Sequence, residues 1–377
     1  MRIAVLMLAS CPWARTIATQ FASQGHEVHV VDFARTPQAG NYISGDFQNE
    51  AVARLSRTVS GLHYLPTPFA SSLRYLAAAR PLAAVCRQLD VDVLITLYGG
   101  GFGMTAWLSR FRPYAVYAVG SDVLFANRLT RPVLRRSLEA AAVVFANGEY
   151  LANQTRLLAP TANVLPLLIG VDTDFFTPKP SPPGPTKLLC SRGFLPVYNN
   201  EVIIRAIAEL PDDTPPFHLT FTSAGPLLSH AKELAAAILP PARRDQISFL
   251  GGVSDEQMHR QLADSEIFLS VSRSDGTSTS LLEAMASGLF PILSDIPQNR
   301  EWIAASAANG LLVHPDDPAG LAAAIRSALS NIEQRRRATS HNRSLVRTRA
   351  DCRSNMQMLT GALARHLRPV SHPRPVS

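Results

Sequence analysis

The feature that most constrains the fold is an alternation of short apolar runs with amphipathic helical segments. In the first half of the chain, apolar runs at 28–32, 91–95 and 115–119 are separated by helical patterns such as 14–24 and 72–88. Buried strands that alternate with helices form a parallel sheet covered by helices on both faces. The first half is therefore predicted to be a doubly wound α/β domain.

The same alternation restarts in the second half, with apolar runs at 186–190, 217–222, 247–250, 267–272 and 290–294. Between the halves, five of the eight residues in 178–185 are prolines, which exclude a helix or a central strand. We therefore expect two Rossmann-like domains facing each other across a cleft, because ligands of such sheets bind outside the carboxyl ends of the strands. The expected divisions are a first domain at 1–177, a linker at 178–185, a second domain at 186–348, a helix at 349–368 and a disordered tail at 369–377.

Composition and charge exclude several classes of protein. Of the 377 residues, 46% are hydrophobic and 17% charged, which is typical of a globular chain with a large core and not of disorder. No window approaches the 18 or more apolar residues of a membrane-spanning helix, and residues 1–8 are interpreted as a first buried strand rather than a signal peptide. We therefore expect a cytoplasmic protein. Of the net charge of +7, +5 lies in residues 1–180, which could attract an anionic membrane or a phosphorylated substrate.

The cysteines do not suggest a metal site or a disulfide framework. They are scattered along the chain and lack zinc-ligand spacing, so we expect buried thiols at Cys11, Cys86, Cys190 and Cys352.

The segment 267–288 is the most informative part of the chain. An apolar strand leads into a loop of small polar residues, and a helix follows from about Ser280, capped by Ser278 or Thr279 and ended by Gly288. Free amides at a helix N-terminus, placed at the carboxyl end of a strand, form an anion-binding site. Asp275 precedes those amides, and Glu283 follows about one turn into the helix. A purely structural alternative is that the first acid begins a turn and the second complements the helix dipole.

The run from Asp275 to Gly288 resembles the signature of retaining GT-B glycosyltransferases, in the group that includes sucrose and glycogen synthases and phosphatidylinositol mannosyltransferases. These enzymes belong to glycosyltransferase family 4, also called glycosyl transferases group 1. The resemblance implies that Glu283 binds the nucleotide ribose and that Asp275, where the family usually has Glu, lies near the donor sugar. It also implies that a run of loop amides holds the donor diphosphate: Gly276, Thr277, Ser278 and Thr279.

Further motifs match the family in order along the chain. Asp122, in Gly120-Ser121-Asp122, and Arg192, in Ser191-Arg192-Gly193, match residues that the resemblance places in the catalytic group with Asp275. Arg192 would bind the diphosphate, and Gly251 lies in the segment expected near the nucleobase. Weaker matches lie at 170–176, 299–301 and 315–318, and the closing helix, roughly 350–367, matches one that crosses back onto the first domain.

Three departures from the family pattern affect the expected site. The lysine that usually follows the diphosphate-binding arginine is absent, and Tyr198 occupies the nearest matching place. Val119 stands where many relatives have a histidine, and residues 9–12 replace a glycine pair. Because no lysine is near, Arg192 is expected to carry more of the diphosphate charge.

Two further segments keep alternative interpretations. The loop 98–103 could approach a phosphate on the acceptor, or it could be a tight strand-to-helix turn. An arginine group could meet an anionic membrane or simply be a solvated helix surface: Arg128, Arg131, Arg135 and Arg136.

The resemblance predicts a retaining hexosyl- or N-acetylhexosaminyltransferase that needs neither a metal nor a cofactor. The expected donor is a UDP-sugar, with a GDP-sugar as the alternative, and the expected acceptor is a hydroxyl of a glycan or lipid-linked saccharide. The enzyme would lie in the cytoplasm or peripherally on the inner face of the membrane, and nucleic acid is not an expected partner because no aromatic–basic motif is present. The alternatives are a GT-B sugar-nucleotide epimerase and a non-catalytic protein that binds a sugar nucleotide or glycan.

Overall fold

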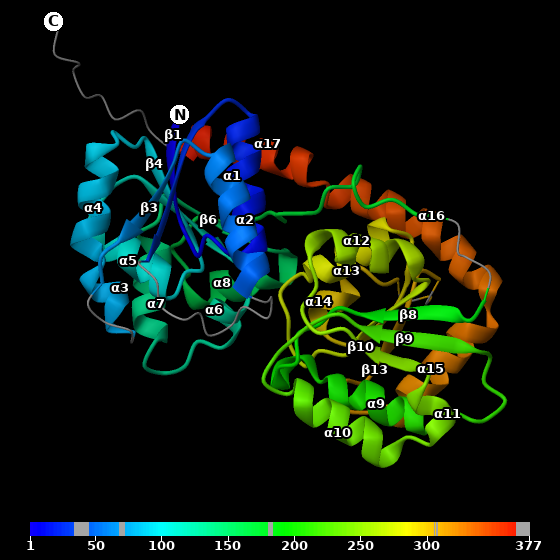
Figure 1. Ribbon diagram of the computed structural model, residues 1–377. Coiled ribbons are helices and arrows are strands. Elements are labelled where there is room, and N and C mark those ends of the chain that lie inside the picture. Colours follow the sequence, from blue (N-terminus) through cyan, green and yellow to red (C-terminus); the bar gives the residue numbers. More distant parts are fainter. Residues whose placement is uncertain (34–44, 68–71, 180–183, 305, 307, 367–377) are drawn as a thin grey trace, which may run out of the picture. The chain divides into compact units, whose positions relative to one another are not determined.

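The computed structural model describes residues 1–33, 45–67, 72–179, 184–304, 306 and 308–366. The chain divides into two compact units, described separately below (Figure 1). The main crossing from the first unit to the second is at Ile169 and Gly170, and the chain returns at Cys352 and Arg353. Residues 45–51, which begin the helix Gly45–Thr58, also group with the second unit.

The first unit contains a seven-stranded parallel sheet in the order β3-β2-β1-β4-β5-β6-β7. The chain winds outward in both directions from the centre, so the order reverses between β1 and β4. The strands are β1 (Arg2–Leu6), β2 (Glu27–Phe33), β3 (Gly61–Leu65), β4 (Val93–Leu97), β5 (Tyr114–Ala118), β6 (Val143–Ala146) and β7 (Val164–Pro166).

Helices connect these strands and cover both faces of the sheet. They are α1 (Pro12–Ser23), α2 (Gly45–Thr58), α3 (Leu73–Ala77), α4 (Ala79–Gln88), α5 (Gly101–Ser109), α6 (Ser121–Leu124), α7 (Arg131–Glu139), α8 (Glu149–Leu158) and α17 (Cys352–His366). The helical pattern predicted over 72–88 is confirmed as two consecutive helices, α3 and α4, with a break at Ala78. Pro81 has no N–H to donate to a carbonyl one turn earlier, so it is tolerated only near the start of a new helix.

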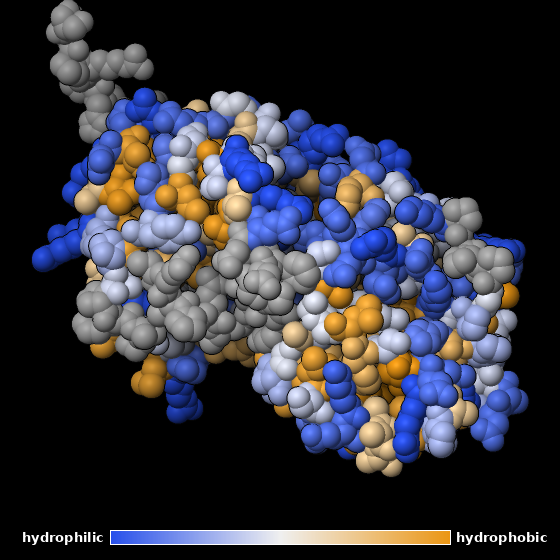
Figure 2. All heavy atoms as spheres, viewed as in Figure 1, coloured by the Kyte–Doolittle hydropathy of each residue, from blue (hydrophilic) through white to orange (hydrophobic). Residues whose placement is uncertain are grey.

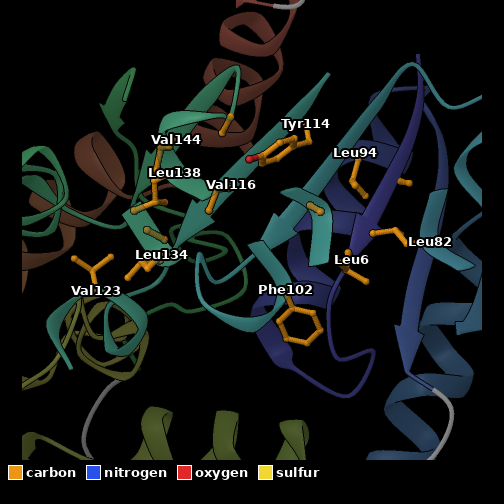
Figure 3. Close-up of a cluster of buried hydrophobic side chains, with 14 of the residues drawn as sticks. Leu6, Leu82, Leu94, Phe102, Tyr114, Val116, Val123, Leu134, Leu138 and Val144 are labelled. Atoms are coloured by element: carbon orange, nitrogen blue, oxygen red, sulfur yellow. The ribbon is translucent and has the colours of Figure 1, made fainter. Parts of the chain in front are cut away.

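The core of the first unit lies on both faces of its sheet. Along β1, Ala4 and Leu6 face one apolar cluster, while Ile3 and Val5 face the other. This is the period-two alternation of a strand, with both faces buried as a parallel sheet requires. Figure 3 shows the first cluster, where side chains of the strands meet those of α4, α5 and α7. On the other face, α17 contributes Met356 and Leu363 to the core.

The second unit repeats the architecture with six parallel strands in the order β10-β9-β8-β11-β12-β13. The strands are β8 (Thr186–Cys190), β9 (Phe217–Phe221), β10 (Ile247–Phe249), β11 (Ile267–Ser270), β12 (Phe290–Ser294) and β13 (Leu311–Val313). The helices are the 3₁₀ turn η1 (Pro196–Tyr198), α9 (Asn200–Ala208), α10 (Leu228–Ile238), α11 (Pro241–Arg244), α12 (Asp255–Asp264), α13 (Thr279–Ala286), α14 (Pro297–Arg300), α15 (Pro318–Ser330) and α16 (Ile332–Arg349).

The predicted fold class is confirmed: each unit is a doubly wound, parallel α/β structure of the Rossmann-like type. All nine predicted strands, including the one expected in residues 1–8, are present, with bounds shifted by at most a few residues. Four strands were not predicted, and they are β3, β6, β7 and β13. Three of these four lie at an edge of a sheet.

The division between the units does not coincide with the expected linker. The first domain was expected to extend to residue 177, whereas the chain changes units at Ile169 and Gly170. Residues 180–183 of the expected linker and the tail 369–377 lie outside the described residues. Gly170 has a φ of +77°, and a β-carbon there would collide with the carbonyl of Ala350. The two crossing segments can therefore lie side by side, joined by hydrogen bonds from the amide of Val171 to the carbonyl of Ala350 and from the amide of Cys352 to the carbonyl of Val171.

The surface in view is mostly hydrophilic, with scattered apolar side chains (Figure 2). Within the part of the chain that the structure describes, no helix is long and apolar enough to span a membrane. All four cysteines are free thiols, and three of them are buried, as expected, while Cys11 is half-buried.

Candidate functional site

The candidate site of the second unit lies where its strand order reverses. The chain runs from β8 towards β9 on one side and from β11 towards β12 on the other, so β8 and β11 are neighbours at the centre of the sheet. Arg192 follows β8 and Asp275 follows β11. The carboxyl ends of such strands form the usual ligand-binding crevice of an open α/β sheet. The sheet topology therefore brings together two residues that lie 83 positions apart in the chain.

The loop after β11 leads into α13 through a side-chain cap. Ser278 has extended backbone angles, and its Oγ accepts a hydrogen bond from the amide of Leu281. The cap predicted at Ser278 or Thr279 is thus at Ser278. Among the described residues, the amides of Thr279 and Ser280 have no backbone acceptor, as expected for the first turn of a helix. The helix dipole and these amides favour a bound anion.

Arg192 is the centre of the hydrogen-bond network. Its Nη1 donates to Oγ of Ser278 at 2.8 Å and to Oγ of Ser280 at 3.2 Å, and its Nη2 donates to Oδ2 of Asp275 at 2.5 Å. The residue is only 7% exposed. The guanidinium is therefore held at the N-terminus of α13 by three partners from the loop after β11 and the first turn of the helix.

The face of the guanidinium is covered by an aromatic ring. Tyr198, in η1, lies with its ring centroid 4.1 Å from Cζ of Arg192, which is within cation–π range. The Nε of Arg192 is buried and has no hydrogen-bond acceptor among the described residues. A buried donor without an acceptor is costly, so this atom marks a place where an anionic ligand would complete the network.

Asp275 is held both through its side chain and through its backbone. Its carbonyl accepts a hydrogen bond from Nε2 of Gln298, on α14, at 2.7 Å. Burial raises the pKa of Asp275, while Arg192 and the amide of Gly276 act in the opposite direction. The structural alternative, in which Asp275 merely begins a turn, does not account for its contact with Arg192.

Glu283 lies half-buried on α13, and no ion pair to it is found among the described residues. Burial and, to a lesser extent, the nearby charge of Asp255 outweigh the opposing effect of Arg192 and raise the pKa of Glu283 to about 8. An acid with this pKa is mostly protonated at neutral pH in the empty site. Such perturbed groups are concentrated at functional sites.

The remaining predicted residues of the second unit lie on the same sheet edge. Gly251 follows β10 with a φ of +72°, and the space around its missing β-carbon is open. Gly276 and Thr277 lie in the loop between Asp275 and the cap. Residues missed by the sequence reasoning are Ser280, Gln298 and Asp255, and no local pattern singles them out because each acts through a contact formed by the fold.

Asp122 belongs to the first unit, where it binds backbone amides. Its Oδ2 accepts from the amide of Gly99 at 2.6 Å and its Oδ1 from the amide of Gly120 at 3.0 Å, while burial raises its pKa. The carboxyl thus joins the ends of β4 and β5. The loop 98–103 forms a strand-to-helix turn into α5, and a β-carbon at Gly99 would meet Cδ1 of Leu134 at 2.9 Å.

No group of three or more His, Cys, Asp or Glu side chains in the described chain is arranged to hold a metal ion. The anion-binding features at Arg192 and α13 are instead of the kind that hold phosphate groups.

Two family models match adjoining parts of the chain. Residues 13–175 match Glycosyltransferase Family 4, and residues 172–345 match Glycosyl transferases group 1. Together they cover every strand of both sheets except β1, and every candidate site residue named above.

Curated relatives are distant. A GDP-mannose:cellobiosyl-diphosphopolyprenol alpha-mannosyltransferase of Xanthomonas campestris is 26% identical over 243 residues, 64% of this chain and 58% of that protein. An exopolysaccharide phosphotransferase of Streptomyces coelicolor is 26% identical over 244 residues, 63% of this chain but 25% of that protein. The matched region therefore spans less than two thirds of either relative.

Solved structures match over almost the whole chain. Sucrose-phosphate synthase from Thermosynechococcus elongatus has a TM-score of 0.80 at 16% identity, with 97% of this chain and 99% of that chain covered. The Anabaena protein HepE, solved in complex with UDP-glucose, has a TM-score of 0.79 at 14% identity, with coverage of 97% and 100%. At these identities the likeness shows the fold, which is GT-B. The fold and the two family matches place this chain among the glycosyltransferases of the family 4, group 1 type.

Proposed function

We propose that the chain transfers a hexosyl or N-acetylhexosaminyl group from a nucleotide donor to a hydroxyl group, with retention of the anomeric configuration. The observation that carries the proposal is the Arg192 cluster, where a buried guanidinium with an unpartnered Nε faces the N-terminus of α13 at the topological switch point. This arrangement suits a diphosphate, because charge-assisted hydrogen bonds and a helix N-terminus both stabilise phosphate oxygens.

The proposed chemistry is an attack on the same face as the departing group. The acceptor oxygen forms a bond to the anomeric carbon, the bond from that carbon to the diphosphate oxygen breaks, and the leaving diphosphate takes the acceptor proton. The protein then stabilises the charge that develops on the diphosphate through Arg192 and the loop amides. It also positions the donor sugar, and we assign that task to Asp275.

The donor is proposed to be a UDP-sugar, with a GDP-sugar as the alternative. The structural neighbour HepE was solved with UDP-glucose, whereas the Xanthomonas relative is named for GDP-mannose. That relative is also named for a diphosphopolyprenol acceptor, which supports a lipid-linked saccharide as the acceptor here.

A thermal-shift screen against nucleotide sugars tests the proposal, because a ligand that binds only the folded state raises the melting temperature. The donor found in this way is then incubated with and without lipid-linked and soluble saccharide acceptors. Proton NMR should find an α-glycoside from an α-linked donor. An altered sugar nucleotide formed without acceptor would indicate the epimerase alternative, and binding without any turnover would indicate the non-catalytic alternative.

Transfer is expected to continue without a divalent metal. The diphosphate charge would be met by Arg192 and amides instead of a cation. Turnover measured in excess EDTA should match turnover measured with added magnesium or manganese. Loss of turnover in EDTA that either metal restores would contradict this expectation.

The first unit is expected to bind anionic membranes weakly through the loop between α6 and α7. Leu129 is 87% exposed and Phe125 is 59% exposed, and they flank Arg128. Asn127 fixes this loop, because its Oδ1 accepts hydrogen bonds from the amides of Leu129 and Thr130. In Figure 2, apolar and strongly hydrophilic atoms project beside each other where Figure 1 draws this loop.

Liposome sedimentation at low salt measures this contact. Each basic residue near the surface contributes about 1 kcal/mol to binding of anionic lipid. Changing Arg128, Arg131 and Arg136 together to serine should therefore abolish binding to anionic vesicles. The matched control changes three exposed arginines of the second unit to serine, removing the same charge: Arg205, Arg336 and Arg347. Equal sedimentation of the wild type with neutral and anionic vesicles would rule the contact out.

A further inference from the structure

We propose that Arg273 and Asp316 are positioning residues that hold Tyr198 against Arg192 and so keep the guanidinium aimed at the donor diphosphate. The inference rests on the proposed function, since it concerns the same diphosphate site. Arg273 and Asp316 form an ion pair close to the turn that carries Tyr198. We call the pair, together with Asn199, the clasp.

Arg273 binds the turn from the same loop that carries Asp275. Its Nε and Nη2 donate to Oδ1 of Asp316 at 3.0 and 2.6 Å, and its Nη1 donates to the carbonyl of Pro196 at 3.1 Å. Its backbone amide donates to the carbonyl of Val197 at 2.9 Å. One residue therefore fixes two consecutive carbonyls of η1 and does so only two positions before Asp275.

The other end of the turn is fixed from the loop after β13. Asn199 adopts a left-handed conformation with a φ of +55°, which ends η1 and which asparagine tolerates better than most residues with a side chain. Its Nδ2 donates to the carbonyl of Pro315 at 2.6 Å and to Oδ1 of Asp316 at 3.2 Å. The same carboxylate oxygen thus receives hydrogen bonds from Asn199, which follows Tyr198, and from Arg273, which binds the carbonyls of the two residues before Tyr198. The hydrogen bond from Arg273 lowers the pKa of Asp316, so the acceptor stays charged at neutral pH.

Packing alone does not hold the turn. A cavity of about 160 Å³ is lined by Pro196, Asn199 and Arg273, among others, but by neither Tyr198 nor Arg192. This side of η1 therefore borders open space instead of a filled core. The polar contacts of the clasp therefore act together with the hydrogen bonds from the side chain of Asn200 to the carbonyls of Arg192 and Gly193 in setting the position of the Tyr198 ring over Arg192.

The ion pair of the clasp is not expected to contribute much to the folding stability of the protein. Both side chains of the ion pair are half-exposed, and exposed ion pairs contribute little to stability. The pair formed by Asp213 and Arg326 has comparable exposure and a distance of 2.8 Å, and it lies at the loop before β9, away from the site. It provides a matched control for general effects of losing a surface ion pair.

Binding of a free nucleoside diphosphate by calorimetry, with UDP and GDP as probes, tests the proposal. Asp316→Asn should raise the dissociation constant about three- to tenfold, an effect worth one or two hydrogen bonds, with the melting temperature within a few degrees of wild type. Asp213→Asn should leave the dissociation constant unchanged. Asp316→Glu should recover part of the affinity, because the carboxylate is retained.

A double variant distinguishes positioning from a direct or merely structural role. If Asp316 acts through Tyr198, then Asp316→Asn adds nothing to the binding defect of Tyr198→Ala, because coupled residues are non-additive. Unchanged affinity in Asp316→Asn, or fully additive defects in the double variant, would overturn the clasp. If wild-type protein binds neither probe nor any nucleotide sugar, it is the proposed function that fails, so the two failures are distinguishable.

Discussion

Replacing Arg192 with alanine is expected to weaken binding of the nucleoside diphosphate by about ten- to a hundredfold and to slow transfer. A charge-assisted hydrogen bond contributes about 1.5–3 kcal/mol, and the guanidinium can offer several of them to a diphosphate. We expect the larger end of the range, because residues 197–200 supply no lysine as a second cation. Calorimetry with the free nucleoside diphosphate measures the change without any contribution from the sugar.

Arg192→Lys separates charge from geometry. Lysine keeps the positive charge but loses the planar fork that reaches Ser278, Ser280 and Asp275, and it stacks less well on Tyr198. Its affinity should therefore lie between those of the wild type and the alanine variant. The alanine variant also leaves Asp275 without its cation, so melting temperatures must accompany the binding data. An unchanged affinity for the free diphosphate in a folded Arg192→Ala protein would remove the arginine from the donor site.

The sequence predicts local elements of this site better than it predicts contacts between them. The loop after β11, the cap at Ser278 and the position of Glu283 on α13 follow from residues that are close in the chain. The ion pair between Arg192 and Asp275 depends on the pairing of β8 with β11, and periodicity does not reveal strand order. The same holds for Gln298, on the short helix α14 after β12, and for Asp316, in the loop after β13.

The contact made by Tyr198 was also not predictable from the sequence. In the sequence it stands only where relatives have a lysine, which suggests a lost contact. In the structure its ring covers the guanidinium of Arg192, so the substitution is accompanied by a new interaction and not simply by a vacancy. The departure is therefore weak support for a non-catalytic protein.

Substitutions of Glu283 and Asp275 are expected to cause different defects, the first in donor binding and the second in turnover. Glu283→Gln should weaken the binding of both the nucleoside diphosphate and the intact donor by about 1.5–3 kcal/mol, because the charge-assisted hydrogen bonds from Glu283 to the ribose are lost. Asp275→Asn should not weaken the binding of the nucleoside diphosphate, since that ligand lacks the transferred sugar. The variant also removes a negative charge that competes with the diphosphate for Arg192. Its defect should appear in turnover, where the position of the transferred sugar matters. Asp275→Glu restores the residue usual in relatives, and it should be harmful if the pocket has adapted to the shorter side chain.

The pKa of Glu283 adds a pH dependence to this prediction. At about 8 in the empty site, the group is protonated below that pH and ionised above it. Ribose hydroxyls bind the carboxylate best, so a bound donor displaces the proton and donor affinity should increase as pH rises towards 8, by at most about tenfold per pH unit. Above that pH the affinity should level off. The difference in donor affinity between wild type and Glu283→Gln is therefore largest near pH 9 and smaller at neutral pH.

A nucleotide sugar is the suitable probe for that measurement, because its diphosphate is esterified at both ends and does not titrate near neutrality. Glu283→Gln should bind it with the same affinity across the range, since glutamine carries no titrating proton. Asp275→Asn should keep the wild-type pH profile of binding, because Glu283 and its neighbour Asp255 remain in place. A pH profile that survives in Glu283→Gln, or the same binding defect in both variants, would mean that the roles of the two acids have been assigned incorrectly.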